Sequence, residues 1–80
     1  MAEKKKVILY VVLHEFETVR YPTLRKAQLV KVITFTAMGL PPMWVEIPVE
    51  KYSPEVEKEY VRKRLEQELG RKITEELRRA

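Results

Sequence analysis

The chain has 80 residues, of which 16 are Lys or Arg and 12 are Glu, so its net charge is +4. It contains no cysteine, which excludes disulfides and thiolate metal sites, and we expect a reducing cytoplasm as its location. A chain of this length predicts one domain over residues 1–80, with a core at about residues 6–70. Its Lys- and Glu-rich composition, without Asp or Asn, is typical of proteins from hyperthermophiles.

The first predicted element is a strand over Val7 to Leu13, a run of seven apolar residues of which four are β-branched. Alternate side chains of a strand point to opposite faces, so this strand is apolar on both. It is therefore predicted to be a central strand with cover on both sides. The run is too short for a membrane span, and no membrane partner is expected.

The next segment has two interpretations. Residues 14–17 predict a turn into a short strand over Thr18–Tyr21, which Pro22 ends. Residues 23–31 favour a short helix, because Thr23 is a suitable N-cap and apolar residues recur behind it at helical spacing. The alternative is a single long strand from Gln28 onward.

Two further strands are predicted before the helix. Residues 32–37 alternate Thr with Ile, Phe and Ala, the pattern of a half-buried strand. Residues 43–49 place Trp44 and Glu46 on one face and Met, Val and Ile on the other. Pro48 lacks an N–H for the ladder, so this strand is predicted to lie at an edge of the sheet.

The clearest signals define a helix over residues 53–69. Ser53 is the predicted N-cap, Pro54 occupies the first helical position, and Gly70 is the predicted C-cap. The apolar stripe of this helix consists of Val56, Tyr60, Val61, Leu65 and Leu69. Residues 71–80 are predicted to be a short second helix or a frayed tail.

These elements predict an α+β fold, with a small, mostly antiparallel sheet of three or four strands packed by one long C-terminal helix. One helix covers one face of such a sheet. If residues 23–31 are a strand, the other face is left bare and a partner chain must cover it. We therefore predict a homo-oligomer, most simply a dimer.

The residues that enzymes use are nearly absent. His14 is the single histidine and is expected to be structural, at the end of a buried strand, with its side chain pointing away from that of Glu15. Glu15 and Glu17 share a face but are expected to be exposed turn carboxylates. Neither glycine lies in a phosphate-binding motif. We predict no catalytic residue, metal or cofactor, and no enzyme activity.

The positive charge is concentrated in the middle of the chain. No acidic residue occurs from Thr18 to Val45, while the segment carries the predicted nucleic-acid-binding residues Arg20, Tyr21, Arg25, Lys26 and Lys31. If they cluster in space, the bases can hold phosphates while the aromatic ring stacks on a nucleobase. The alternative is a solvated basic surface without a ligand.

A second candidate surface is apolar. Residues 38–44 form a Pro-stiffened loop that either folds over the core with Trp44 as a lid or docks a partner. The predicted partner-binding residues are Met43, Trp44, Ile73 and Leu77. The sequence thus predicts a small non-enzymatic binding module, with nucleic acid as the first ligand. The alternative is a homodimeric protein-interaction or assembly subunit that uses an apolar sheet face and this loop.

Overall fold

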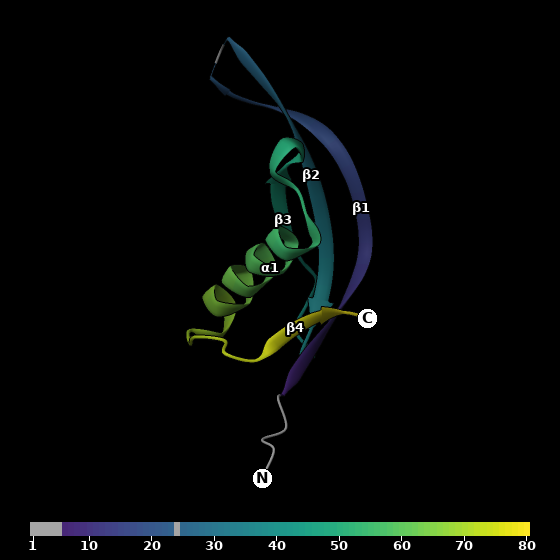
Figure 1. Ribbon diagram of the computed structural model, residues 1–80, viewed down its shortest axis with the longest axis vertical. Helices are drawn as coiled ribbons and strands as arrows, with labels where there is room; N and C mark the ends of the chain where they lie inside the picture. The colour runs from purple at the N-terminus through teal and green to yellow at the C-terminus, as the bar shows by residue number, and fades with distance from the viewer. Residues whose placement is uncertain (1–5, 24) are drawn as a thin grey trace.

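The computed structural model describes residues 6–23 and 25–80, as four strands, one α-helix and one short 3-10 helix (Figure 1). The strands form one sheet in the order β3-β2-β1-β4. The predicted α+β class is confirmed. The elements are β1 (Val7–Thr23), β2 (Lys26–Ala37), β3 (Met43–Pro48), η1 (Val49–Lys51), α1 (Pro54–Leu69) and β4 (Glu76–Arg79).

The longest element is β1, which pairs with β2 in antiparallel fashion along almost its whole length. The prediction of two short strands separated by a turn at residues 14–17 is wrong. A shift in register between Val12 and His14 takes the place of that turn, so the polar residues continue the strand. Such a bulge inserts an extra residue without ending the ladder.

The predicted helix over residues 23–31 is also wrong, because β2 begins at Lys26. The alternative interpretation, a strand that includes Gln28 onward, agrees better with the structure. Pairing with β1 outweighs the weak helical spacing of this segment, since helix propensity amounts to only a few tenths of a kcal/mol per residue, about 0.7 at most for ordinary residues. The strand then runs unbroken to Ala37, where Met38 and Gly39, both at positive φ, form a tight turn.

The predictions for the remaining strands are mixed. β3 lies at one edge of the sheet, as predicted, and ends at Pro48, one residue before the predicted end at residue 49. Residues 76–79, predicted as helix or tail, instead form β4, which pairs in parallel with Val7–Tyr10. Ile73 and Leu77 are four residues apart, a spacing that is common in helices. Here both are apolar because both side chains are buried in the core.

Helix α1 begins and ends as predicted. The Ser53 side chain accepts a hydrogen bond from the N–H of Val56, and Gly70 adopts the left-handed conformation at the C-terminus. The helix packs Val61 and Leu65 onto one face of the sheet, which we call the inner face. The core on this face contains residues from all four strands: Ile8, Tyr10, Ile33, Phe35, Ala37, Met43, Val45, Ile47 and Leu77.

The molecule is elongated and measures 56 × 25 × 22 Å. Its two central strands, β1 and β2, extend well beyond the other elements (Figure 1). β3 pairs with β2 only as far as Val30, and β4 pairs with β1 only as far as Tyr10. Beyond Val30 the sheet is reduced to a two-stranded ribbon. We call this ribbon, residues 19–23 and 25–29, the arm, and the rest of the described residues the body.

Candidate functional site

The sheet face opposite α1, which we call the outer face, has no helix over it in the part of the chain that the structure describes. Val30 and Val32, its apolar residues on β2, are only 5 % exposed. Its other apolar side chains are between 37 and 58 % exposed. They lie along β1 and on β3 and comprise Val7, Leu9, Val11, Phe16 and Trp44, which we call the outer patch. The expectation that the first strand is covered on both faces is therefore wrong within this chain. Exposed apolar clusters of this kind on small proteins usually mark interaction sites.

Two ion pairs border the outer patch. On one side the Arg20 Nε lies 2.7 Å from the Glu46 Oε1, and on the β4 edge the Arg78 Nη2 lies 3.4 Å from the Glu76 Oε2. The charges cancel within each pair. An apolar centre with a neutral polar rim is the composition of a protein–protein interface rather than of a phosphate-binding surface.

The basic residues of the central segment do not converge on one face. Arg20 is on the outer face and is paired with Glu46. Lys31 is on the inner face, where its Nζ lies 3.6 Å from the Glu15 Oε2 and 4.2 Å from the centre of the Tyr52 ring. The sequence could not predict this separation because it depends on the register of β1 against β2.

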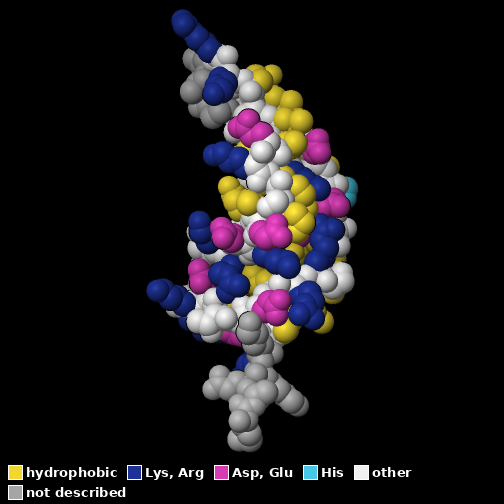
Figure 2. Space-filling view, viewed as in Figure 1, with side chains coloured by type: hydrophobic (Ala, Val, Ile, Leu, Met, Phe, Trp, Pro, Cys, Tyr) yellow, Lys and Arg dark blue, Asp and Glu magenta, His cyan; other side chains and the backbone are white. Residues whose placement is uncertain are grey.

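The remaining predicted nucleic-acid-binding residues lie in the arm. Arg25 and Lys26 are exposed where the chain turns from β1 into β2, and Figure 2 shows Lys and Arg side chains at this end of the molecule. Tyr21 is 70 % exposed. Neither Arg25 nor Lys26 forms an ion pair with a carboxylate in the part of the chain that the structure describes. Among the described residues of the arm, the bases that form no ion pair with a carboxylate thus lie only at its tip, because Arg20 is paired with Glu46.

The four predicted partner-binding residues separate into two groups. Trp44 is 58 % exposed on the outer face, so it is not a lid over the core. Met43, Ile73 and Leu77 are buried in the core and are not accessible to a partner. Only Trp44 therefore contributes to the exposed surface, because successive residues of β3 point to opposite faces of the sheet.

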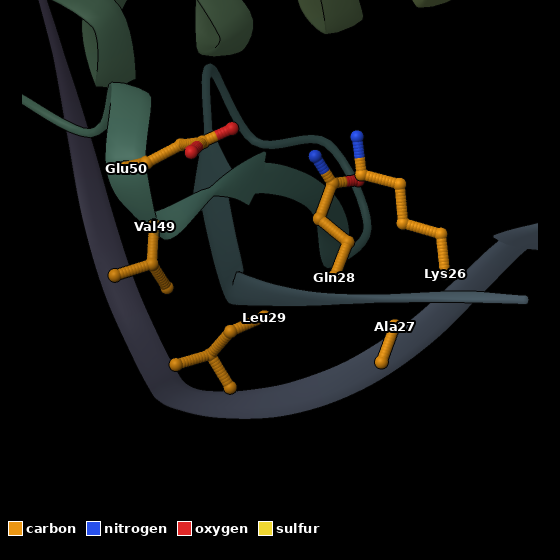
Figure 3. A pocket seen from close by; sticks show the side chains of 6 residues that line it. All are labelled: Lys26, Ala27, Gln28, Leu29, Val49 and Glu50. Carbon is orange, nitrogen blue, oxygen red and sulfur yellow. The ribbon is translucent and has the colours of Figure 1, made fainter.

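A groove of about 390 Å³ lies along residues 26–29 of the arm, near the point where β3 ends and η1 begins (Figure 3). Ala27 and Leu29 point to one side of β2, and Lys26 and Gln28 to the other. Val49 faces the same region as Leu29, and the groove is completed by Glu50. The lining carries one positive and one negative side chain, so it favours neither an anion nor a cation.

A buried carboxylate joins α1 to the sheet. Glu57 is only 3 % exposed and accepts hydrogen bonds from the Tyr10 hydroxyl, the Tyr52 hydroxyl (2.9 Å) and the Arg79 Nη2 (3.0 Å). The same Arg79 nitrogen donates to Glu15 at 3.0 Å. This cluster ties the C-terminal strand to the helix and to β1.

The cluster is suited to structure rather than to proton transfer. Burial alone would raise the pKa of Glu57, but hydrogen bonds from Tyr10, Tyr52 and Arg79 outweigh it and hold the pKa below its ordinary value. Burial and the neighbouring Glu57 raise the pKa of Tyr10. A carboxylate held ionised by three donors is a weak base, and a phenol with a raised pKa is a poor acid.

The other candidate acid–base residues lie within β1. His14 is exposed at the bulge, with its ring 5.3 Å from that of Phe16, rather than at the end of a buried strand. Glu15 and Glu17 both pair across inner-face residues of β2, so they share a face as predicted, although in a strand and not in a turn. Among residues 6–23 and 25–80, no group of three or more His or Glu side chains is placed to hold a metal ion.

The Glu57 cluster was not predicted, although the sequence contains a signal for it. Glu57 precedes Val61 and Leu65 at spacings of four and eight, so it lies on the apolar stripe of α1. A carboxylate at such a position must find donors inside the protein. Its partners could not be named in advance, because Tyr10 and Arg79 are brought there by the pairing of β4 with β1.

Comparison with known proteins finds no family, no curated protein and no solved structure that matches this chain. In the described residues, no helix is long and apolar enough to cross a membrane.

Proposed function

We propose that this chain is a non-enzymatic assembly module that binds another protein chain through the outer face of its sheet. The observation that carries the proposal is the outer patch, whose side chains are about half exposed although they belong to the strands that build the core. Burying one such aliphatic side chain contributes roughly 1.5 to 3 kcal/mol when it passes fully out of water. A partner that covers the patch recovers much of this free energy.

The neutral rim supports a protein as the partner. The ion pairs Arg20–Glu46 and Arg78–Glu76 leave the border of the patch without net charge. Interfaces between proteins combine an apolar centre with such a rim, whereas nucleic-acid interfaces carry a strong positive charge.

Site-specific photocrosslinking tests this proposal. A photoreactive amino acid is placed at Leu9 in the centre of the outer patch, and at Gln67, an exposed residue of α1, as the matched control. We expect a defined protein adduct from the Leu9 position in the native cell, and none from the Gln67 position. Equal labelling from both positions, or no adduct from Leu9, would contradict the proposal.

A second candidate function, nucleic-acid binding through the arm, is favoured by one observation. The arm is a two-stranded ribbon without acidic residues, and it carries Arg25 and Lys26 at its tip. A two-stranded ribbon is narrow enough to enter the major groove of DNA. Two phosphate contacts predict that duplex binding weakens roughly tenfold between about 50 and 200 mM salt.

The matching experiment is a titration of single- and double-stranded DNA and RNA at these two salt concentrations. Replacing both tip residues, Arg25→Glu and Lys26→Glu, is expected to abolish binding. The control pair, Lys63→Glu and Lys72→Glu, makes the same change of charge at exposed positions of the body. Binding that survives the first pair of changes would exclude the arm tip as the contact.

A further inference from the structure

The edge of β1 that faces away from β2 is open along most of its length. β4 pairs only with Val7–Tyr10, and the last backbone hydrogen bond on this side runs from the N–H of Ala80 to the carbonyl of Tyr10 (2.9 Å). From Val11 to Thr23, no other strand of the described residues lies beside this edge. A row of unpaired backbone donors and acceptors is a template for another strand.

The arm also lacks support of its own. A two-stranded hairpin is at best marginally stable in water without a third strand or a packed face. Val19 and Leu29, which lie opposite each other in the arm, are both 45 % exposed. A strand added along the open edge of β1 converts the ribbon into a three-stranded sheet.

The regular part of the open edge is His14–Arg20. Shifts in register occur just before it, between Val12 and His14, and just after it, between Arg20 and Thr23. Bulges are one means by which proteins blunt an edge against pairing. The segment between them has continuous pairing with β2 and is therefore extended and able to accept a partner.

A second copy has the same open edge and the same unsupported arm, so one antiparallel pairing supports both arms. Glu15 and Glu17 point to the inner face and Arg20 to the outer face. Antiparallel pairing about Thr18 sets Glu15 against Tyr21 and Glu17 against Val19, so no two like charges lie directly opposite each other. Parallel, in-register pairing would set each of these charges against its own counterpart, which destabilises a sheet.

The register follows from symmetry. A two-fold axis perpendicular to an antiparallel pair places one residue opposite its own counterpart. An axis at Glu17 would bring two carboxylates together, whereas an axis at Thr18 sets Thr18 against Thr18 and Phe16 against Arg20. With the axis at Thr18, Thr23 of the second copy, the last residue of its β1, lies opposite Leu13. The paired part of the second copy therefore ends before Tyr10, the last residue that pairs with β4.

We propose that two copies of this chain associate by antiparallel pairing of their β1 edges about a two-fold axis at Thr18, so that each arm lies along the body of the other copy. This inference goes beyond the proposed function, since it names a second copy of the chain as a partner. It adds a different surface, because edge pairing joins the two sheets side by side and leaves both outer patches on one continuous face.

The test uses the absence of cysteine from the chain, which makes an introduced thiol unique. Thr18→Cys places the two thiols across the axis, where opposite Cβ atoms are about 4.5–5.5 Å apart. Thr34→Cys is the matched control, because Thr34 lies on the outer face but on β2, away from the edge. Under mild oxidation, we expect the Thr18→Cys disulfide dimer to form at least about tenfold faster than that of Thr34→Cys.

Two measurements on the unmodified chain complete the test. Light scattering is expected to give a dimer mass, and amide hydrogen exchange to show concentration-dependent protection at alternate residues of His14–Arg20. A monomer mass at all concentrations would overturn the inference, and so would a dimer that is crosslinked through Thr34→Cys with its edge amides unprotected. In either case a specific adduct from Leu9 would leave the proposed function standing, so the two failures are distinguishable.

Discussion

The two halves of β1 contrast within one strand. In the body, Ile8 and Tyr10 are buried beneath α1 and β4 pairs alongside them. In the arm, β2 is the only strand of the described residues that lies beside Val19, and Val19 is almost half exposed. Both halves have the extended conformation and the same antiparallel pairing, so hydrogen bonding to one neighbour does not by itself bury a strand. The body is stabilised by α1 and by β4, which pack on β1 or pair with it, whereas in the described residues neither element reaches the arm.

The largest effect is expected from breaking the Glu57 cluster, which fastens the body. Glu57→Ala removes the acceptor from Tyr10, Tyr52 and Arg79 and leaves a partly buried guanidinium without its closest partner. Loss of one member of a buried ion pair costs about 3–5 kcal/mol. Urea denaturation should show this loss as a lower midpoint, and a change below about 1 kcal/mol would mean that the cluster is not important for stability.

Matched truncations of leucine sharpen the comparison between body and arm. Leu65→Ala leaves a cavity between α1 and the sheet and is expected to cost about 2–5 kcal/mol. Leu29→Ala shortens a side chain that is 45 % exposed in the arm, and should change the unfolding free energy by less than about 0.5 kcal/mol in the monomer. Equal losses in the two variants would show that the arm is packed as tightly as the body.

Lowering the pH is expected to reduce the unfolding free energy by a smaller amount than the removal of Glu57 does. The folded pKa of Glu57 is lower than that of an unfolded Glu, so the folded state binds fewer protons as the pH falls. The contribution of the carboxylate is therefore complete at neutral pH. It is lost as the pH falls below the ordinary range of Glu and through the lowered pKa.

The measurement is the unfolding free energy at a series of pH values from about 7 down to about 2. Glu57→Gln is the matched variant, because it keeps the shape of the side chain and cannot titrate. The pH dependence of the unmodified chain should exceed that of Glu57→Gln in the acid range. Parallel curves would show that this carboxylate does not contribute to acid sensitivity.

Elements with local signals were predictable from the sequence, and those fixed by partners distant in the chain were not. Helix α1 was predicted to the residue at both ends, because Ser53, Pro54 and Gly70 act on the backbone next to them. The inward residues of β3 were predicted from simple alternation. β4 was not predicted, because four residues that include two arginines form a strand only when Val7–Tyr10 lies beside them.

The candidate surfaces show the same limit. The exposed Trp44 was identified, since it alternates with buried residues of β3. The outer patch along β1 was assigned to a covered core, because composition shows that Leu9 and Val11 are apolar but not whether this chain supplies a second layer. The separation of Arg20 from Lys31 depends on a bulge, which no residue pattern announces.

Removal of the arm is expected to have a small effect on the unfolding free energy of the body. Replacing residues 19–29 by the dipeptide Asn-Gly connects Thr18 to Val30 through a two-residue turn. Thr18 and Val30 already lie opposite each other in the ladder. A two-residue Asn-Gly turn fits the twist of an antiparallel pair. Among the residues whose burial the structure describes, the core of the body contains none from the arm. The unfolding free energy of the monomer should therefore change by no more than about 1 kcal/mol. Association through β1 should be lost in the same variant, because half of the proposed edge is gone. If the shortened chain still forms the dimer, the contact lies on the outer patch and not on the β1 edge. If the shortened chain does not fold, the arm is required for the stability of the body.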